Sequence, residues 1–495
     1  MGAVMRCRPC GETLWRDAVF SGLAYGLALW CMPGIGLPLA ACCLLPLLRH
    51  WQQALDSDAP LPWRRLWLAS LLGMLLGQWL TLGYFLPQAP FIMPWVLTVQ
   101  GLIATLPWLL LPLFRPLLGR HTLWALPALW VGCDWAESML DWLVPTPLGV
   151  TLGTAAPLLP LYAWTGIGGG TLLLLVLQVG VVQAGLNRHG LRLGAAVAGG
   201  WLLLGGGLCL SLPPVQDDRA ARPLALVRSG PLTDDNRGEL ALQDRLLRLS
   251  GKAVAAGARL VVWPESALLN GLTEPGAVTE TLARWMARRQ VGLLAGHLDA
   301  DHNGVSVRWP DGRLASYHKR WLVPAAEHPY LLGLGPGRLQ PGVAASSLPV
   351  PEGGRLGPLI CYEVLIGRAG VEQVRAGATA LLVLANDVDF WNTPARWQLD
   401  AMARIRAVET GRDLLRVTSV GSLWHVDAWG RQVWRDDETT PAAHLVWPQW
   451  REGLTWYVRY PASLPVLALA GLVAGCLLAL GRRYRQRRML TAVTC

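Results

Sequence analysis

Long apolar segments dominate the first 212 residues, and they constrain the fold more than any other feature of the chain. About 20 apolar residues cross a bilayer as a helix, because a helix satisfies its own backbone hydrogen bonds in lipid. Candidate segments lie at 17–32, 34–48, 66–86, 92–113, 122–140, 164–186, 193–212 and 461–481. We therefore expect an α-helical membrane domain with about eight transmembrane helices, seven of them before residue 213.

Arginine clusters between these segments predict the orientation of the chain in the membrane. Cytoplasmic loops carry an excess of Lys and Arg. With eight spans, all the clusters fall on one side, so both termini are expected in the cytoplasm and residues 213–460 on the opposite side. The clusters also explain the net charge of +10, so we expect no nucleic-acid partner. They lie at 6–16, 49–65, 115–120, 188–192 and 482–488.

Residues 213–460 have the composition of an ordinary globular domain. The whole chain is only 15% charged, against about 25% in soluble proteins, and the deficit lies in the apolar segments. A stretch of about 250 residues can build its own core. We expect three parts: a membrane domain at 1–212, a soluble domain at 213–460, and a last span with a basic tail at 461–495.

Strands and helices alternate in the soluble domain. This alternation predicts a layered α/β domain with a mixed sheet. Turn signals at Asn303-Gly304, 310–312 and 427–430 predict hairpins. Expected strands lie at 223–228, 259–263, 291–297, 355–360, 378–385 and 413–419, and expected helices at 237–257, 276–289, 367–376 and 394–411.

Cys361 is the only cysteine between residues 213 and 460, so that domain holds a free thiol and no internal disulfide. It stands where the apolar run 356–360 turns polar, as expected for a strand that delivers a nucleophile to the edge of a sheet. Most free cysteines are buried as small hydrophobic residues. The residues alone leave both interpretations open.

Glu265 and Lys319 also stand at the ends of strand-like runs. Glu265 could be a general base or an acid at the start of a helix. Lys319 could stabilise an oxyanion or be a solvated hairpin charge. A thiol, a carboxylate and an ammonium brought together suffice for nucleophilic catalysis, and Lys319 is expected to make the Cys361 thiolate more available at neutral pH.

Six short motifs occur in one order, and together they resemble the nitrilase superfamily, whose enzymes use a Glu-Lys-Cys triad. Seven spans before this domain and one after it resemble the apolipoprotein N-acyltransferase family, its membrane-bound branch. The motifs are Trp-Pro-Glu-Ser at 263–266, Tyr-His-Lys-Arg-Trp-Leu-Val-Pro at 317–324, Glu327, Ile-Cys-Tyr-Glu at 360–363, Asn-Asp at 386–387, and Arg-Trp-Gln at 396–398 leading into 402–409.

The resemblance implies an αββα sandwich on the periplasmic side of a bacterial inner membrane. It also implies roles for individual residues and requires no metal or organic cofactor. Glu265 would be the base, Lys319 the oxyanion stabiliser and Cys361 the nucleophile. Among the remaining matched positions, Glu327 would help to hold the triad, Tyr362 and Glu363 would line the site, and Asn386 would support it.

The same resemblance implies acyl transfer from a membrane phospholipid, through a cysteine thioester, to the N-terminal amine of a diacylglyceryl-cysteine lipoprotein. A monomer is expected. Three alternatives remain: a related membrane nitrilase with another acceptor, such as a conjugal-transfer or pilin-associated enzyme; an amidase that uses water; and an inactive scaffold.

Some features depart from the family pattern or carry no assignment. Asn386-Asp387 runs into Val-Asp-Phe-Trp rather than the usual small residue and Trp-Phe-Gly, and the arm at 328–354 is short. These departures bear on the acceptor more than on the chemistry. We assign no role to Asp134, Glu137 or the Cys7/Cys10 pair.

Overall fold

The computed structural model describes the chain outside a few short segments, and these residues form two compact units. One unit comprises 155–164 and 205–461; the other comprises the remaining residues. Cys7 and most of the arm at 328–354 lie outside the described residues. The described ranges are 10–87, 90–140, 143–184, 188–212, 223–231, 239–324, 326–327, 339–350 and 354–493.

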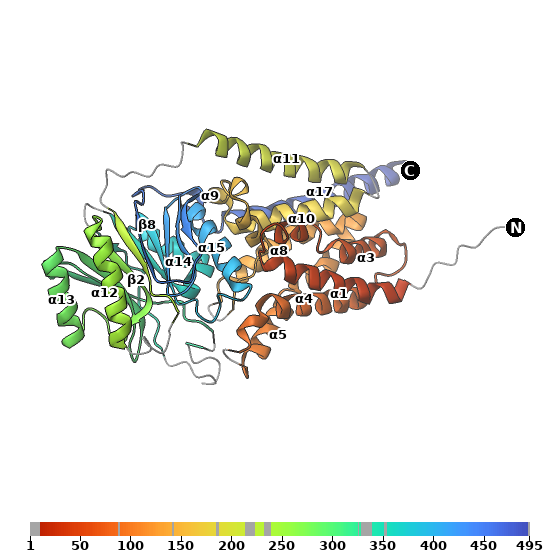
Figure 1. Cartoon of the computed structure of the whole chain (residues 1–495). Helices are drawn as coiled ribbons and strands as arrows, with labels where there is room; N and C mark the ends of the chain where they lie inside the picture. Colours follow the sequence, from red (N-terminus) through yellow and green to blue (C-terminus); the bar gives the residue numbers. More distant parts are fainter. Residues whose placement is uncertain are drawn as a thin grey trace. The chain divides into compact units, whose positions relative to one another are not determined.

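Two six-stranded mixed sheets form the centre of the unit that contains 205–461 (Figure 1). In each sheet three neighbouring strands run parallel, and the flanking strands pair antiparallel. The first sheet has the order β12 (Ala442–Val446), β1 (Leu224–Arg228), β2 (Leu260–Leu268), β3 (Gly292–Leu298), β4 (Asn303–Arg308), β5 (Leu314–His318). The second has the order β11 (Gln432–Asp436), β10 (Leu423–Val426), β9 (Leu414–Thr418), β8 (Ala380–Ala385), β7 (Arg355–Ile360), β6 (Leu348–Pro349).

The two sheets pack face to face, and helices cover their outer faces. Side chains from β1–β5 and from β6–β10 share one apolar core. A second core lies between the first sheet and the helices α12 (Glu239–Ala255) and α13 (Ala277–Arg289). On the other sheet, α14 (Gly367–Arg375) contacts β7 and α15 (Ala395–Thr410) contacts β9. The layers are therefore helix, sheet, sheet, helix.

Most of the predicted strands and helices of this unit agree with the structure, but one turn was placed wrongly. Asn303-Gly304 begins strand β4 instead of reversing the chain. The reversal lies just before it, where the Asp299 side chain accepts hydrogen bonds from the backbone N–H groups of Asp301 and His302 (2.9 and 2.6 Å). Such a local side-chain turn replaces the Asn-Gly turn that the sequence suggested. Strand β12 was not predicted.

The other unit is helical. The described residues of the chain contain five segments long and apolar enough to cross a membrane, one of which, Gly194–Ser211, crosses the boundary between the two units at residue 205. They are Trp63–Phe85, Met93–Glu137, Ile167–Ala184, Gly194–Ser211 and Ser463–Gln486. The predicted count of eight spans is not confirmed. The predicted spans 92–113 and 122–140 lie almost entirely within the single segment Met93–Glu137. Most of 17–32 lies in α1 (Cys10–Leu29), which is not among the five.

The predicted span 34–48 is interrupted. It forms α2 (Gly36–Ala40) and the start of α3 (Leu45–Asp56). Gln178 of α10 (Ile167–Ala184) compensates for the break: its side-chain oxygen accepts from the Leu44 backbone N–H (2.7 Å), and its amide donates to the Ala40 carbonyl (3.0 Å). A buried break in a helix needs such partners, because no water is available to replace them.

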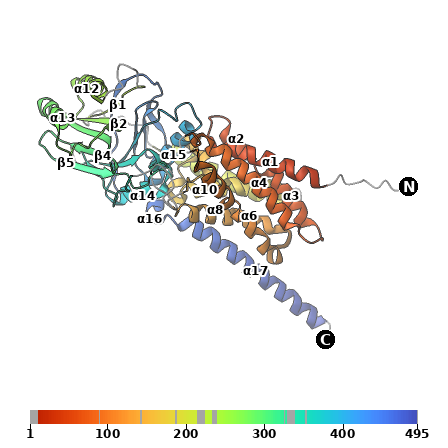
Figure 2. The same cartoon turned by 90° about the horizontal axis from the view of Figure 1, so that it is seen from below.

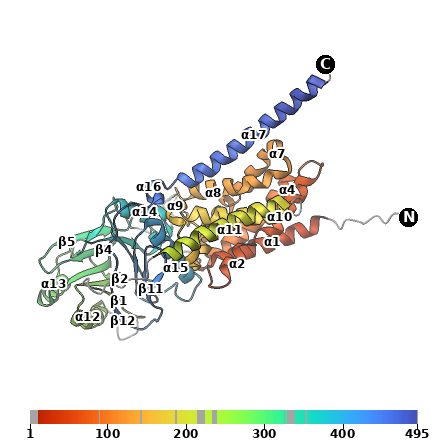
Figure 3. The same ribbon diagram turned by 90° about the horizontal axis from the view of Figure 1, so that it is seen from above.

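Glycines allow the first helices of this unit to approach closely. Helix α1 lies along α4 (Trp63–Leu82) (Figure 2), and a side chain at Gly22 or Gly26 would collide with the backbone of Gly73 or Gly77. Small residues at such contacts are typical of helices that pack in lipid. The last helix, α17 (Ser463–Val493), contacts α7 (Arg115–Leu118) and α8 (Leu126–Glu137) (Figure 3).

Gly296 of β3 provides a test of how tightly the first sheet is packed. A Cβ at this position would lie 2.5 Å from the Pro264 carbonyl oxygen and 2.6 Å from Glu265 Cα on β2. Gly296→Ala should therefore force the two strands apart and lower the free energy of unfolding by about 1–3 kcal/mol. In contrast, Gly251→Ala, in open space on α12, should raise it by about 0.5–1 kcal/mol. Thermal unfolding of both variants checks this; equal effects would contradict it.

Candidate active site

Cys361 stands at the carboxyl end of β7, where the strand passes directly into the short 3-10 helix Cys361–Leu365. Its φ of 50° is in the left-handed region, which non-glycine residues rarely adopt. Ser266, which follows Glu265, has a φ of 54°. Backbone strain of this kind is found at functional sites, where surrounding structure maintains it. Two of the four such non-glycine residues in the described part of the chain thus lie at this site.

Glu265 is held from two sides. It lies on β2 and is 7% exposed. Its Oε1 accepts a hydrogen bond from Asn303 Nδ2 (2.7 Å), and its Oε2 accepts one from the backbone N–H of Asn386 (2.8 Å). Because Asn386 follows β8, this second bond ties the carboxylate on the first sheet to the second sheet. The carboxylate therefore has a defined orientation.

Lys319 is completely buried, immediately after β5. Its Nζ donates to Glu327 Oε1 at 2.8 Å and lies 3.8 Å from Glu265 Oε1. Asn303 bridges the two carboxylates, because its Nδ2 also donates to Glu327 Oε1 (3.1 Å). One ammonium and one amide thus hold two acidic side chains together in a buried site.

Glu363 fixes the position of Lys319 relative to Cys361. Its Oε1 accepts from the Tyr317 hydroxyl (2.6 Å) and from the backbone N–H groups of Arg320 (2.8 Å) and Trp321 (3.3 Å). Its Oε2 accepts from the Ile360 backbone N–H (2.7 Å). The first three partners flank Lys319 in the sequence, and Ile360 directly precedes Cys361. The fully buried carboxylate is therefore a structural clamp between the two strands.

The remaining predicted residues differ in exposure. Tyr362 is buried, at 3% exposure, whereas Asn386 is exposed and accepts a hydrogen bond from the Ser419 hydroxyl through its Oδ1. A cavity of about 70 Å³ lies against Glu265 on this side, lined in part by Ser266, Asn386 and Ser419. Tyr362 and Glu363, which were expected to line the site, both have buried side chains. The hydrogen bonds of Glu363 favour a role in positioning Lys319 and Cys361.

Burial and charge set the protonation states at the site. Burial raises the pKa of Glu265, an effect that nearby Lys319 only partly offsets. Burial alone would lower the pKa of Lys319, but Glu327 and Glu265 outweigh it and raise the pKa above its usual value. Burial would raise the pKa of Glu327, but Lys319 holds it below the ordinary value. The ammonium and Glu327 are therefore charged at neutral pH.

Lys319 acts on the thiol of Cys361 in the expected direction, because it lowers the pKa, but burial has a larger opposing effect. Burial raises its pKa well above the ordinary value, Glu265 adds to this, and the opposing effect of Lys319 is smaller. The Cys361 thiol thus gives up its proton less readily than an ordinary cysteine does. Attack by its sulfur requires a base that takes the proton as the bond forms.

Asn303 is the residue that sequence reasoning missed. Its Asn-Gly context indicated a turn, and this hid its role as the shared donor to Glu265 and Glu327. The pairing of Asn303 with the end of β5, where the Lys319 backbone N–H donates to the Asn303 carbonyl (2.8 Å), can be recognised only once the strand register is known.

In the described part of the chain, no group of three or more His, Cys, Asp or Glu residues is arranged to hold a metal ion.

Comparison with known proteins places this geometry in context. The carbon-nitrogen hydrolase family profile matches residues 238–458. An apolipoprotein N-acyltransferase of Chlorobaculum tepidum is 25% identical over 92% of this chain and 95% of its own length. Enzymes of that name from Allorhizobium ampelinum and Rhizobium rhizogenes are 28% and 32% identical, over 50% and 39% of this chain. Those two alignments span only 52% and 40% of the relatives' own lengths.

Two solved structures are similar over about half of the chain. Nit3 of Saccharomyces cerevisiae, a member of branch 10 of the nitrilase superfamily, has a TM-score of 0.36 and 19% identity, covering 49% of this chain and 93% of its own. A carbon-nitrogen hydrolase from Helicobacter pylori has a TM-score of 0.35 and 17% identity, covering 46% and 88%.

The two carboxylates beside Lys319 should respond differently to substitution. Glu327→Gln removes the close partner of a buried ammonium and should lower the free energy of unfolding by about 3–5 kcal/mol at pH 7. Glu265→Gln also disturbs a hydrogen bond, but it removes a charge whose burial is unfavourable, so its loss should be under about 1 kcal/mol. Unfolding followed by circular dichroism checks the order, and a larger loss for Glu265→Gln would contradict it.

The pH dependence supplies a second check on the same variants. Because the folded-state pKa of Glu327 is lowered, its stabilising effect is present above its ordinary value of 4.5 and is lost as the pH falls through the lowered value. The gap between wild type and Glu327→Gln should therefore be full at pH 7 and narrow below pH 4.5. Because the pKa of Glu265 is raised, its unfavourable contribution at pH 7 should vanish below pH 4.5.

Proposed function

We propose, on the premise that this chain belongs to the apolipoprotein N-acyltransferase family of carbon-nitrogen hydrolases, that it is an acyltransferase acting through a thioester on Cys361. The donor would be a membrane phospholipid and the acceptor the N-terminal amine of a diacylglyceryl-cysteine lipoprotein. One chain supplies all the groups that the reaction needs, so we propose that it acts as a monomer without a cofactor. The relatives' names support acyl transfer to apolipoproteins.

The observation that carries this proposal is that a buried carboxylate, a buried ammonium and a half-buried thiol lie together. Lys319 Nζ lies 3.8 Å from Glu265 Oε1, and Cys361 is close enough to interact electrostatically with both. A raised pKa makes Glu265 a more effective base near neutral pH than an ordinary glutamate. The three groups thus suit a thiol that must lose its proton during attack.

In the first half-reaction the Cys361 sulfur attacks the ester carbonyl carbon of the phospholipid while Glu265 takes the thiol proton. The carbonyl oxygen becomes an oxyanion, which the Lys319 ammonium stabilises; such interactions are worth about 3–4 kcal/mol. The bond from the carbonyl carbon to the glycerol oxygen then breaks, and Glu265 returns its proton to that oxygen. The products are a thioester and a lysophospholipid.

In the second half-reaction the amine of the acceptor attacks the thioester carbonyl, and Glu265 takes a proton from the amine. The carbon–sulfur bond breaks, and the thiol is regenerated with the proton held by Glu265. Lys319 can serve both halves because it has three N–H donors, one of which is directed to Glu327. The product is an amide, so the reaction consumes no water.

The apolar helices support a lipid substrate over a small soluble amide. A two-chain phospholipid stays in the bilayer because each buried methylene contributes about 0.8 kcal/mol. A plain amidase has no need of five apolar segments of membrane-spanning length. Water as the acceptor remains the competing outcome, and the following experiment separates the two.

Purified protein given phospholipid without an acceptor should accumulate an acyl thioester. We expect incubation with labelled phosphatidylethanolamine to add the mass of one fatty acyl group to the peptide containing Cys361. The adduct should be released by hydroxylamine, and a diacylglyceryl-cysteine peptide should discharge it. Intact-protein and peptide mass spectrometry provide the measurement.

Substitutions at the site serve as controls for this adduct. Cys361→Ala should abolish it, and Glu265→Gln should slow its formation by at least about 100-fold, as expected for loss of a general base. Free fatty acid released without any adduct would instead favour a hydrolase. A stable adduct that the peptide cannot discharge would favour a different acceptor.

The membrane topology is a further part of the proposal. We propose a membrane domain at 1–212, a catalytic domain at 213–460 on the periplasmic side of the inner membrane, and a last span with a basic tail at 461–495. The arginine clusters at the proposed cytoplasmic ends support this orientation.

Reporter fusions test that orientation. A reporter fused after Pro214 should report the periplasm, and one fused after Arg488 should report the cytoplasm. An alkaline phosphatase and a fluorescent protein at each site provide reciprocal readouts. The same compartment at both positions would refute the topology.

A further inference from the structure

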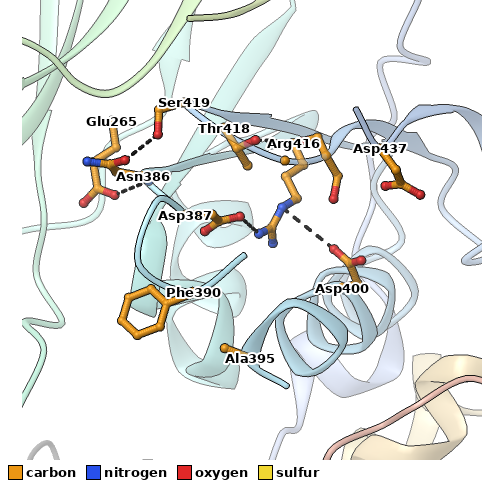
Figure 4. A network of polar contacts seen from close by, with 12 residues as sticks. Glu265, Asn386, Asp387, Phe390, Ala395, Asp400, Arg416, Thr418, Ser419 and Asp437 are labelled. Carbon is orange, nitrogen blue, oxygen red and sulfur yellow. Dashed lines mark hydrogen bonds and ion pairs between the residues drawn. The ribbon is translucent and has the colours of Figure 1, made fainter. Parts of the chain in front are cut away.

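A buried charged network lies next to the proposed active site (Figure 4). Arg416, on β9, is fully buried and donates through Nη2 to Asp387 Oδ2. Its Nε lies 3.9 Å from Asp400 Oδ1 on α15. Arg435 donates to the other oxygen of Asp400 (2.6 Å) and stacks over Trp424, with its guanidinium carbon 4.6 Å from the ring centroid. The network thus joins β9, α15 and β11 to the segment after β8.

This network is poorly suited to a purely stabilising role. Arg416 Nε and Nη1, Asp387 Oδ1 and Asp400 Oδ1 are buried and have no hydrogen-bond partner among the described residues. Burying charged groups that lack some of their hydrogen bonds is unfavourable. Apolar residues of similar volume at such positions often give a protein that is equally stable or more stable. The position of the network therefore calls for another explanation.

The network leads directly to the base. Asp387 follows Asn386, and its carbonyl oxygen accepts from the backbone N–H groups of Phe390 (3.0 Å) and Trp391 (2.8 Å), which folds 387–391 into a turn. The preceding N–H, that of Asn386, donates to Glu265 Oε2. Ser419, just beyond β9, donates its hydroxyl to Asn386 Oδ1 (Figure 4). Two side chains from one strand and its end thus hold the segment that orients Glu265.

We infer that Arg416, through Asp387, is a positioning residue for the base Glu265, because it fixes the turn whose Asn386 N–H holds the carboxylate. The inference rests on the proposed function in one respect: Glu265 must act as the base for Cys361. It extends the site beyond Glu265, Lys319 and Cys361 to a buried pair at 387 and 416.

A charge effect and a positioning effect of this pair differ in their consequence for the pH dependence. The Asn386 N–H stabilises the charged form of Glu265, so loosening the turn should raise the pKa of the base and move the acidic limb of the reaction to higher pH. In contrast, Asp387 opposes ionisation of Cys361, whereas Arg416 favours it. If the pair acted only through charge, these two effects would be lost together and would offset each other, so the acidic limb would not move upward.

The test uses a neutral pair, Asp387→Asn with Arg416→Gln, which leaves neither charge unpaired. The readout is the burst of p-nitrophenol when the full-length protein in detergent is acylated by p-nitrophenyl butyrate, measured from pH 5 to 8. The acidic limb should move up by about one pH unit, as expected for loss of one hydrogen bond to a charged group. Well below the wild-type midpoint the burst should be about tenfold slower.

A control removes another arginine–aspartate ion pair of the same domain, in which the arginine is buried and the aspartate is half-buried. Arg228 is fully buried, and its Nη2 lies 2.9 Å from Asp436 Oδ2. Arg228→Gln with Asp436→Asn should lower the unfolding temperature but leave the acidic limb in place. Asp387→Asn alone, a smaller change that leaves Arg416 facing Asp400, should shift the limb in the same direction by less, and it decides the question if the first variant fails to fold.

An unshifted or lowered acidic limb in the folded Asp387/Arg416 variant would overturn the inference, as would an equal shift in the control. A wild-type burst without a phospholipid thioester would contradict the proposed donor while leaving this test valid. Absence of any wild-type burst would contradict both.

Discussion

The candidate site depends on the burial of a single ammonium. Lys319 is 0% exposed, so its charge is tolerable only with acidic partners nearby. Glu327 is the close partner, at 2.8 Å, and Glu265 is the distant one, at 3.8 Å. This difference in distance gives two chemically identical side chains different pKa values. Glu327 stays ionised and neutralises the lysine, whereas the less compensated Glu265 has a raised pKa and suits a base.

Two backbone turns complete the arrangement. Cys361 and Ser266, the residue after Glu265, both have positive φ, which places the carboxylate beside an irregularity within β2 and the thiol at the turn after β7. Glu363 maintains the second turn by accepting from the N–H groups of 360, 320 and 321. A strained backbone conformation persists only when contacts with the surrounding structure hold it in place. The buried carboxylate of Glu363 supplies those contacts between the sheet-edge segments that carry Lys319 and Cys361.

Much of the fold could be predicted from the sequence because its signals are local. Alternation of strand-like and helical runs predicted the mixed layered domain, and the apolar run ending at Cys361 predicted a strand that delivers the thiol. The number of membrane-spanning helices could not be predicted as well from the sequence. A break in an apolar segment is allowed only if another helix satisfies it, as Gln178 does between Ala40 and Leu44. That partner is 134 residues away from Leu44 in the chain.

The sequence by itself determined which chemical groups are present and in what order: a carboxylate at 265, an amine at 319 and a thiol at 361, each at the end of a strand-like run. The tertiary structure decided how those groups behave. Asn303 became the donor shared by two carboxylates because β4 pairs with β5. The pKa of Cys361 is raised because desolvation outweighs the charge of Lys319. Strand register and burial depend on contacts between residues that are far apart in the chain, so no local pattern of residues specifies them.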